Sequence, residues 1–527
     1  MSLEIQSEEN LFNANNVLSN FLSETDPMVL FSKEIRGKFK NDDFTLYYSK
    51  KGRNGISPSF LTCVSILQWR ENLSDTETAE ACVKRLDWKI ALGLTVEWKE
   101  VFDPSTLCRF RKRLIKHEKM SLIFDKILDI CKEKGFIQER SKQRIDATHV
   151  VKHINRISTT DLLFRAVKAL VIEIEEKAKE FYENKISEDL KERYSKTFSS
   201  FGLSKVTRSD KQAEIVEDGL KLKLLLSNES SLKDLNQLSI MEKIFSENVI
   251  IREKEINEKI FIEVDEIQAP KQTIFDPTDT TIKLGVKGKT KWVGSKCHVV
   301  ETAEKGKINF ITGMIQQAAQ ENDNKILPKV EKNNESHDLK PEKLFADSNY
   351  ISSKDIKDFK EKNQELMGFA QQDSSQKPDD YKLEKFEIDM STFSAVCPAG
   401  NKSEKTVEQK NGDYNIYFSK AGCANCPAFQ QCVGSSKEKR RRLNVGKNYV
   451  FLKQRREEQK TKEFRKEMKV RAQVEGTISE LVRFHGLRKI KYKGEKGREM
   501  QFLSAGVGLN IKRLFKALTF GLELQHS

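Results

Sequence analysis

The first 140 residues show a helical pattern of apolar and polar positions. In the segment SPSFLTCVSILQWREN, apolar residues recur at mixed spacings of three and four, which is typical of a helix with one buried face. A second segment begins at Ser74, where Glu77 follows as in a capping box, and Gly93 is placed to end it. A third, DPSTLCRFRKRLIKHEKM, has Asp103 or Ser105 as a candidate cap. We therefore predict several capped helices here.

The third of these helical segments is strongly basic. It carries Arg109, Arg111 and Arg113, and a basic helix that follows a capped one fits a helix-turn-helix-like DNA-binding domain. A helical bundle with a solvated basic face would show the same pattern. The sequence leaves both interpretations open.

The pattern changes after this helical region. Residues 158–261 are rich in Glu and Lys at helical spacing and contain no cluster of reactive side chains, so we expect a helical insertion. Partly alternating segments such as TKWVGSKCHVVET and KINFITGMI predict strands, and a long basic helical segment follows from about 448 to 485. No apolar run reaches the roughly 20 residues that would span a bilayer, so we expect no membrane association.

Composition narrows the class of protein. The chain has 527 residues, of which 37% are hydrophobic and 33% charged, which is enough for two to four domains with proper cores. Acidic residues near the start argue against a secretory signal, so we expect a cytoplasmic protein with reduced cysteines. The net charge of +14 favours a polyanionic partner, and nucleic acid is the commonest one.

Three acidic residues have distinctive settings. Asp146 lies in SKQRIDATHVVKHINR, Asp347 in EKLFADSNYISSKDI, and Glu475 in VRAQVEGTISELVRFHGLRKIKYKG. Taken alone, each aspartate would be a turn or cap residue, and Glu475 would form a surface ion pair with Arg471, four residues earlier. Asp347 follows a short apolar run, and the helix start signalled by Ser352 comes too late for Asp347 to be its obvious cap.

Together, these three contexts resemble the DDE transposases of bacterial insertion sequences. The similarity extends to LSDTETAEACV, DPSTLCRFRKRL, DPTDTTIKLGVKGKTKWVGSKCHVVET and the closing LNIKRL, and covers the chain from about residue 55 to 516. The resemblance implies a multi-domain α+β protein with an all-helical N-terminal DNA-binding domain and an RNase H-like α/β core, a mixed sheet flanked by helices. It places the N-terminal domain at 1–140, the core at 141–157, 262–372 and 448–520, the helical insertion at 158–261, and a Cys-rich insert at 373–447.

The resemblance also implies a reaction. Asp146, Asp347 and Glu475 would converge and bind two Mg²⁺ or Mn²⁺ ions, ~3.5–4 Å apart, that support in-line phosphoryl transfer. The protein would then cleave double-stranded DNA at the terminal inverted repeats of its own element and join it to target DNA. A homodimer is expected, because two ends must be brought together. Bound to DNA, it would lie at the bacterial nucleoid.

The sequence departs from the family pattern beside the third acid. Many relatives have a Tyr three residues before the Arg and a Lys seven residues after the Glu, where this chain has Met468 and Val482. Arg483 and Lys489 are nearby cations, but they would project differently from a helix. A catalytically decayed or host-adopted sequence-specific DNA-binding protein is therefore an alternative. A second alternative is a zinc-stapled RNA-binding or structural protein, which leaves the three acid contexts unexplained.

Four cysteines form a second group. Cys423 and Cys426 make a C-x2-C pair, and Cys397 and Cys432 lie within reach, as in a structural zinc site. The spacing alone does not exclude an iron–sulfur cluster or unliganded thiols. The remaining cysteines stand singly in apolar or helical contexts and are expected to be small core residues: Cys63, Cys82, Cys108, Cys131 and Cys297.

Further candidate DNA contacts lie in the second half of the chain. Arg440, Arg441 and Arg442 follow the cysteines and could contact the DNA backbone, although a solvated basic face explains them as well. Arg471 and Arg483 flank the third acid and are candidates for the same role.

Overall fold

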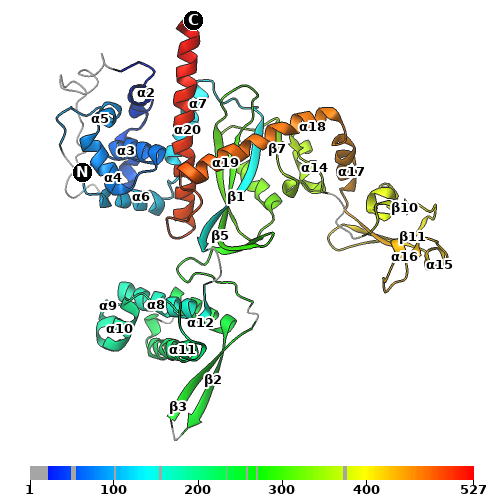
Figure 1. Cartoon of the computed structure of the whole chain (residues 1–527), viewed down its shortest axis with the longest axis horizontal. Coiled ribbons are helices and arrows are strands. Elements are labelled where there is room, and N and C mark those ends of the chain that lie inside the picture. Colours follow the sequence, from blue (N-terminus) through cyan, green and yellow to red (C-terminus); the bar gives the residue numbers. More distant parts are fainter. Residues whose placement is uncertain are drawn as a thin grey trace.

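The computed structural model arranges the chain as four regions around a central sheet (Figure 1). A helical N-terminal region and the long last helix lie on one side of the sheet, a mainly helical arm lies below it in this view, and a small β-rich module lies at the far side. The structure describes residues 22–48, 55–99, 102–153, 157–232, 234–256, 259–268, 271–371 and 377–526.

The N-terminal region is helical, as predicted. Its α-helices are α2 (Pro27–Glu34), α3 (Pro58–Glu71), α4 (Asp75–Lys84), α5 (Leu86–Leu92), α6 (Ser105–Lys116) and α7 (Leu122–Glu133), with 3₁₀ turns at Arg36–Lys38 and Asn41–Tyr47.

The predicted start and stop signals of this region are confirmed. The Ser74 hydroxyl accepts a hydrogen bond from the Glu77 amide, and the Glu77 carboxylate accepts one from the Ser74 amide, which closes the capping box of α4. Gly93 ends α5 with a φ of 67°. The segment between these two signals is two helices, because the chain leaves helical geometry at Arg85. Asp103 accepts a hydrogen bond from the Ser105 amide at the start of α6.

A mixed sheet forms the centre of the molecule. Its strands are β1 (Gln143–His153), β4 (Lys283–Lys287), β5 (Thr290–Thr302), β6 (Ile311–Ala318), β7 (Lys343–Phe345) and β8 (Glu365–Met367). The order is β4-β5-β1-β7-β8, and β6 also pairs with β5. β1 is antiparallel to β5 and parallel to β7, which is in turn parallel to β8.

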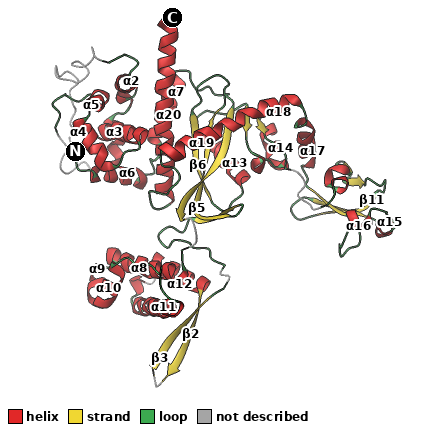
Figure 2. Ribbon diagram, viewed as in Figure 1, coloured by secondary structure: helices red, strands yellow, loops and turns green. Residues whose placement is uncertain are grey.

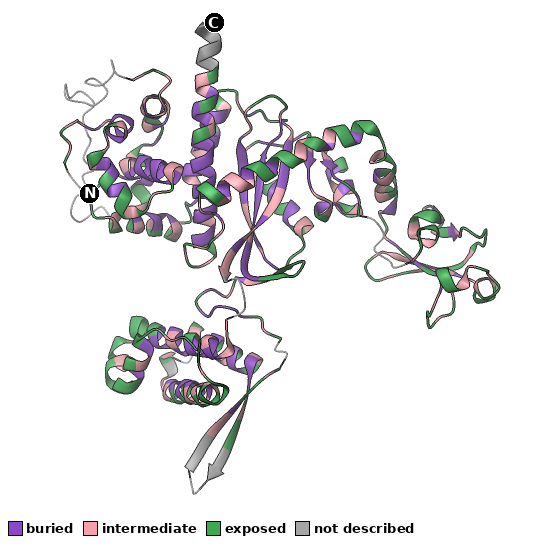
Figure 3. Ribbon diagram, in the orientation of Figure 1, coloured by how far each residue is buried: buried purple, intermediate pink, exposed green. Residues whose placement is uncertain are grey.

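Helices cover and link this sheet. They are α13 (Leu327–Ser336), α14 (Ser353–Glu361), α17 (Tyr449–Glu458), α18 (Lys462–Met468), α19 (Gln473–Phe484) and α20 (Glu495–His526). The long basic helix predicted near 448 to 485 is thus divided into α17, α18 and α19, with a 3₁₀ turn at Lys469–Ala472 before α19. α20 packs against α3, α7 and β6, so it joins the N-terminal helices to the sheet. In Figure 3 the buried residues concentrate in the sheet and in the helices beside α20.

The insertion after β1 has its own apolar core. It contains α8 (Thr159–Lys177), α9 (Lys179–Lys185), α10 (Glu188–Ser195), α11 (Lys205–Ser227) and α12 (Asn236–Asn248), followed by the hairpin β2 (Val249–Ile256) and β3 (Lys259–Glu266). Leu163, Val167, Ile215 and Ile244 are among its buried residues. The prediction of helices throughout 158–261 was wrong for this hairpin, although VIIREKEI and KIFIEVDE are rich in β-branched residues.

The Cys-rich region folds as a small module of strands and short helices (Figure 2). It contains β9 (Glu387–Asp389), β10 (Ser394–Val396), β11 (Ser403–Glu408), β12 (Tyr414–Phe418), β13 (Arg442–Val445), α15 (Lys420–Ala424) and α16 (Phe429–Cys432). Phe386, Ile416, Phe418 and Leu443 form its core.

Two simpler predictions can be compared with the structure. Among the cysteines expected in the core, Cys63, Cys82, Cys131 and Cys297 are buried, whereas Cys108 is half-buried. Within the described ranges, none of the helices is both long and apolar enough to pass through a bilayer.

Candidate active site

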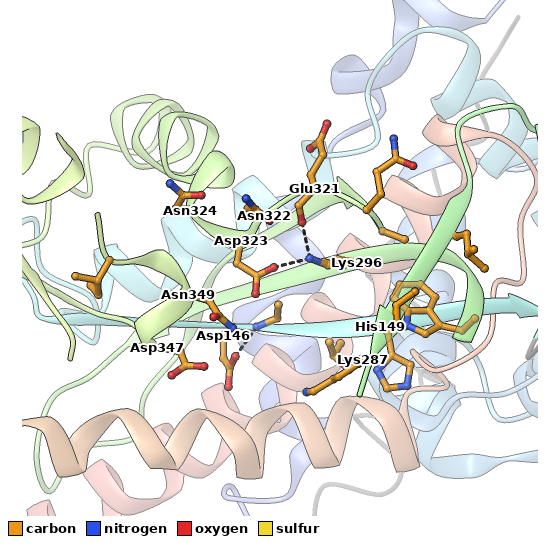
Figure 4. Close-up of a pocket in the computed structure, with 18 of the residues that line it drawn as sticks. Asp146, His149, Lys287, Lys296, Glu321, Asn322, Asp323, Asn324, Asp347 and Asn349 are labelled. Carbon is orange, nitrogen blue, oxygen red and sulfur yellow. Dashed lines mark hydrogen bonds and ion pairs between the residues drawn. The ribbon is translucent and has the colours of Figure 1, made fainter. Parts of the chain in front are cut away.

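Parallel pairing of β1 and β7 brings two of the three acids to the same level of the sheet. Arg144 on β1 lies opposite Phe345 on β7, and Asp146 and Asp347 each follow two residues later. The neighbour Ile145 is buried in the core, and by strand alternation Asp146 points the other way. Asp146 and Asp347 line one cavity of about 740 Å³, where Figure 4 shows them side by side.

Each aspartate accepts a hydrogen bond from the amide of the residue that follows it. The Ala147 N–H donates to Asp146 Oδ1 at 2.7 Å, and the Ser348 N–H donates to Asp347 Oδ1 at 2.7 Å. Asp347 thereby caps the 3₁₀ turn Ser348–Tyr350. It is therefore a turn residue that also faces the cavity. As expected, Ser352 caps the next helix, α14.

Arg471 links the first acid to the third. Its guanidinium lies 3.3 Å from Asp146 Oδ2 and 3.3 Å from Glu475 Oε1. Glu475 lies in the first turn of α19 with its side chain 64% exposed. The light-orange helical segment in Figure 4 runs beneath Asp146 and Asp347, and its colour is that of the α18–α19 stretch in Figure 1. One guanidinium therefore bridges two carboxylates that are 329 positions apart in the sequence.

The clustered negative charge changes the acidity of Asp146. Burial raises its pKa above the usual range, and the nearby Asp347 and Glu475 charges raise it further. The Ala147 N–H and the Arg471 guanidinium oppose this shift in pKa. An additional cation near the acids would favour ionised Asp146.

A buried ionic network, which the sequence analysis did not predict, lies behind the acids. Glu301 on β5 is fully buried, and its carboxylate accepts hydrogen bonds from Arg144 Nε at 2.7 Å and from Arg513 Nη1 at 2.7 Å. The Thr477 hydroxyl donates to both Glu301 oxygens, at 2.9 and 3.0 Å. A buried carboxylate with two arginine partners connects β1, β5, α19 and α20. The only sequence signal was an acid at the end of the apolar run CHVVET.

This network holds the helix that carries the third acid. Arg144 also donates to the Val470 carbonyl at 3.1 Å and to Gln473 Oε1 at 2.6 Å. Gln473 and Thr477 lie two residues before and two after Glu475. The position of Glu475 relative to β1 is therefore set by contacts of its neighbours, while its own side chain stays largely exposed.

A second buried network lies near Asp347. Tyr350 Oη is 2.7 Å from His298 Nδ1, and His298 Nε2 is 2.8 Å from Gln317 Oε1. Burial lowers the pKa of His298 to about 4, so the imidazole is neutral at neutral pH. Because the Gln317 oxygen can only accept, we assign the proton to Nε2, and Nδ1 then accepts from the Tyr350 hydroxyl. These contacts fix the turn that begins at Asp347.

Two protein-family models match the chain. The model described as a transposase DDE domain matches residues 396–515, a range that includes Glu475. The model described as a transposase domain (DUF772) matches residues 16–113, which include the N-terminal helices α2 to α5 and part of α6. The chain belongs to the DDE transposases of insertion sequences. Searches of curated proteins and of solved structures found no match.

In this transposase, the three candidate DNA-binding arginines of α6 have different surroundings. Arg109 is exposed, whereas Arg113 lies over the Tyr48 ring, 4.0 Å from its centroid. Arg111 is buried and forms a two-pronged ion pair with Asp75 at 2.6 and 2.9 Å. The expectation that Arg111 contacts DNA is therefore corrected: it ties α6 to α4 from inside the protein.

The arginines that follow the cysteines show the same division. Arg441 is buried and donates to the Tyr381 and Cys432 carbonyls, so its expected role in DNA contact is likewise corrected. Arg440 lies over the Tyr417 ring, and Arg442 is exposed. Of the two arginines on either side of Glu475, Arg471 contacts the acids and Arg483 is exposed in the last turn of α19.

The two positions that depart from the family pattern are occupied by packing residues. Met468 is buried in a small cluster with Phe345, Met367 and Phe464. Val482 is partly buried against the main core. Neither side chain carries a charge or a hydrogen-bond donor that could hold a phosphate.

The four grouped cysteines line a small cavity of about 100 Å³ in the Cys-rich module. The Asn401 N–H donates to Cys397 Sγ at 3.3 Å, and the Arg441 N–H donates to Cys423 Sγ at 3.5 Å. Burial raises the pKa of Cys432, while Arg441 and Lys377 oppose that shift. None of the four forms a disulfide bond.

Neither the acids nor the cysteines form a complete metal-binding group in this conformation. Over the described part of the chain, no three His, Cys, Asp or Glu side chains are close enough together to hold one ion. The Arg471 guanidinium lies between Asp146 and Glu475, where it compensates part of their charge.

Proposed function

We propose that this transposase cleaves DNA at the terminal inverted repeats of its insertion sequence and joins the ends to target DNA, with Asp146, Asp347 and Glu475 at the reaction centre. The supporting observation is that Asp146 and Asp347 share one cavity while Arg471 connects Asp146 to Glu475. Three acids from distant parts of the chain thus lie in one neighbourhood, beside a cavity of about 740 Å³.

The sheet topology supports an RNase H-like core. If the hairpin of the insertion and the short β4 are set aside, β1 is the first strand of the core and β7 the fourth. Asp146 then lies on the first strand, Asp347 follows the fourth, and Glu475 lies on a later helix, as the family resemblance implies. We keep the proposed division into an N-terminal domain, a split core and two inserts, and extend the first insert to Glu266 to include its hairpin.

The donor set of the acids suits Mg²⁺ or Mn²⁺, since both ions prefer carboxylate oxygens. Asp146 and Asp347 each have one oxygen that does not bond the following amide. The pKa of Asp146 is raised first by burial and then by the charges of Asp347 and Glu475, and a cation would neutralise those charges. Such ions would supply an activated water or 3′-hydroxyl and stabilise the leaving oxygen. The residues Asp146, Asp347 and Glu475 would hold them.

The protein's own side chains have supporting roles in this proposal. Arg471 compensates the charge of Asp146 and Glu475, and we propose that it turns to a DNA phosphate when cations occupy the acids. The Glu301 network keeps α19 against β1, and the Tyr350–His298 pair holds the turn after Asp347. Water or a DNA hydroxyl is the nucleophile, so no covalent enzyme intermediate is needed.

The proposal assigns DNA binding to exposed cations. Arg109 and Arg113 on α6, Arg440 and Arg442 in the Cys-rich module, and Arg483 on α19 are solvent-accessible to different degrees. We propose that the N-terminal domain recognises the inverted repeats, and that two copies of the chain act together in the cytoplasm to pair two ends. Contacts between exposed arginines and the DNA backbone provide affinity without sequence specificity.

We also propose that Cys397, Cys423, Cys426 and Cys432 bind a structural Zn²⁺. They line one cavity, and amide N–H groups already donate to two of the sulfur atoms. Such N–H···S bonds would stabilise thiolates. The ion would staple the loop before β11 to the α15–α16 segment.

An end-cleavage assay tests the catalytic proposal. Wild-type protein and Asp347→Asn are incubated with Mg²⁺ and a labelled duplex containing the element's end, and Glu335→Gln, an exposed acid on α13, serves as a charge-matched control. We expect cleavage by the wild type and the control but not by Asp347→Asn. Equal cleavage by Asp347→Asn would remove that residue from the site, and end binding without any cleavage would favour a DNA-binding protein that has lost its activity. A preference for RNA over end DNA in competition would favour the RNA-binding alternative.

A further inference from the structure

The cavity that contains the acids extends along β1 to a second group of residues. Beyond Asp146 and Asp347 it is lined by His149 on β1 and by Val286 and Lys287 at the end of β4. Figure 4 shows His149 and Lys287 on one side of Asp146, with Asp347 on the other. One cavity therefore has the two aspartates at one end and the cation Lys287 at the other.

The hairpin formed by β4 and β5 ends in a cationic tip. Lys287, Lys289 and Lys291 are all exposed, and none of them forms an ion pair with an acid in the described ranges of the chain. Lys296, by contrast, lines the same cavity but is 2.7 Å from Asp323. Val286, 62% exposed, is an apolar residue among these lysines. The tip thus presents three lysines without an ion-pair partner among the described residues, and one of them, Lys287, lines the cavity of the acids.

This hairpin is held firmly against the sheet. Trp292 on β5 is buried and covers Gly285 on β4, where a Cβ would lie 2.5 Å from the indole ring. Gly294 approaches the Val150 carbonyl so closely that a Cβ there would lie 2.0 Å from it. Both glycines are needed for this close packing. The lysines of the tip are therefore presented from a fixed position relative to Asp146.

A cation from another part of the chain contacts the same stretch of β1. Arg488, in the segment after α19, donates to the His149 carbonyl at 2.7 Å. Burial lowers the pKa of His149 to about 4, with Arg488 and Lys287 contributing, so the imidazole is neutral at neutral pH. His149 therefore adds no positive charge at neutral pH. Within the part of the chain that the structure describes, neither Lys287 nor Arg488 forms an ion pair with an acid.

We propose that the β4–β5 hairpin binds the phosphates of the DNA next to the cleaved bond, on one side of the acids. Lys287, Lys289 and Lys291 make these contacts, with Arg488 beside them. This inference rests on the proposed function, because it takes the cleaved phosphate to lie at Asp146 and Asp347. DNA carries one charge per roughly 1.7 Å of helix axis, so a strand whose phosphate reaches the acids must place further phosphates along the groove. The hairpin cations fit those phosphates, and Val286 can pack against a sugar. These contacts would supply the grip that Met468 and Val482 cannot.

The test compares two charge-matched triple variants. The hairpin variant is Lys287→Gln/Lys289→Gln/Lys291→Gln, and the control, Lys179→Gln/Lys196→Gln/Lys221→Gln, removes three exposed lysines of the insertion. Binding is measured in EDTA, without divalent cations, to two duplexes. One extends from the cleavage point only into the element, and the other only into the flanking DNA. Thermal unfolding of both variants confirms that they fold.

We expect the hairpin variant to lose about tenfold or more in affinity for one of the two duplexes only, and the slope of log K against log salt to fall by about 2–3 for that duplex. The control should lose less than about twofold on either, because distant surface charges are screened. A loss no larger than that of the control, or an equal loss on both duplexes, would overturn the proposal.

Cleavage by the wild type with Mg²⁺ tests the proposed function separately. A wild type that cleaves, together with a hairpin variant that binds both duplexes like the control, would leave the catalytic proposal standing and remove the hairpin from it. If the hairpin variant loses affinity for one duplex only and the wild type does not cleave, the hairpin is retained as a DNA contact and the catalytic proposal is rejected.

Discussion

The acid site and the Cys-rich module are both candidate metal sites, but they are built differently. Asp146 and Asp347 are placed by the strand pairing of the central sheet, and the helix of Glu475 is anchored by the buried Glu301. The four cysteines lie in a module with a small separate core and short strands. Strand pairing thus places two of the three acids, whereas the described contacts of the cysteine module include no comparable buried carboxylate, so its fold would depend more on the proposed zinc. Loss of ligands should therefore affect chemistry in the first region and local folding in the second.

The largest expected effect is on catalysis at the acid site. We predict that Asp146→Asn lowers the rate of end cleavage by at least ~10³-fold, because losing about 4 kcal/mol of metal-dependent transition-state stabilisation has that effect. The measurement is the single-turnover rate with saturating Mg²⁺. Retention of more than a tenth of the rate would show that Asp146 is not at the reaction centre.

Asp146→Asn should not destabilise the protein, whereas loss of a cysteine ligand should destabilise the cysteine module. The pKa of Asp146 is raised in the folded protein, so between its ordinary and folded values the folded state binds more protons than the unfolded state. Ionisation of Asp146 therefore lowers stability as pH rises through this window. We expect Asp146→Asn to unfold at a higher temperature than wild type at pH 7 without metal ions, and the gain to disappear below the ordinary pKa of aspartate. A lower midpoint at pH 7 would contradict this sign.

The anchor of the third acid should show a large effect on folding. Glu301→Gln leaves Arg144 and Arg513 without their buried counter-charge, and breaking such a buried pair costs about 3–5 kcal/mol. The matched control is Glu480→Gln, which removes a more exposed ion pair between the same two helices, α19 and α20, and should cost less than about 1 kcal/mol. Urea unfolding of both variants measures the difference. Equal losses would show that the network does not anchor α19.

Local signals in the sequence predicted part of this architecture. The capping box at Ser74, the helix end at Gly93 and the cap of α14 at Ser352 depend on neighbouring residues, and each is present in the structure. The apolar run before Asp347 correctly indicated β7. Such features can be predicted because the donor and the acceptor lie a few positions apart.

Features that depend on distant partners could not be predicted in the same way. Arg111 and Arg441 look like their basic neighbours in the sequence, yet both are buried because Asp75 and the Tyr381 carbonyl lie beside them in the fold. Glu301 is separated from Arg144 and Arg513 by 157 and 212 positions. The hairpin of β2 and β3 was missed because its many charged residues resemble the helices before it.

A moderate effect is expected in the cysteine module. We predict that Cys423→Ser releases the proposed zinc and makes residues 377–447 more sensitive to protease, because Cys423 no longer supplies a thiolate to the staple. Cys108→Ser, at a half-buried single cysteine, should leave zinc content unchanged. Zinc stoichiometry by metal analysis and limited proteolysis are the measurements. The proposed zinc site would be rejected if wild-type protein contains no zinc, or if the module of Cys423→Ser resists protease as well as that of the wild type.

The smallest expected effect concerns Arg471, which lies between α19 and the sheet and affects the pKa of Asp146. Its charge lowers the pKa of Asp146, against the larger effect of burial and the repulsion from Asp347 and Glu475. Removing it in Arg471→Gln should raise that pKa further, so that the acidic limb of the pH–rate profile for end cleavage moves to higher pH. Lys466→Gln, an exposed cation on α18, is the control for loss of one positive charge, and its profile should keep the wild-type position. If the rate instead falls equally at every pH and the acidic limb does not move, Arg471 acts in DNA binding alone. The pKa of Asp146 would then be set by its burial and by the other two acids.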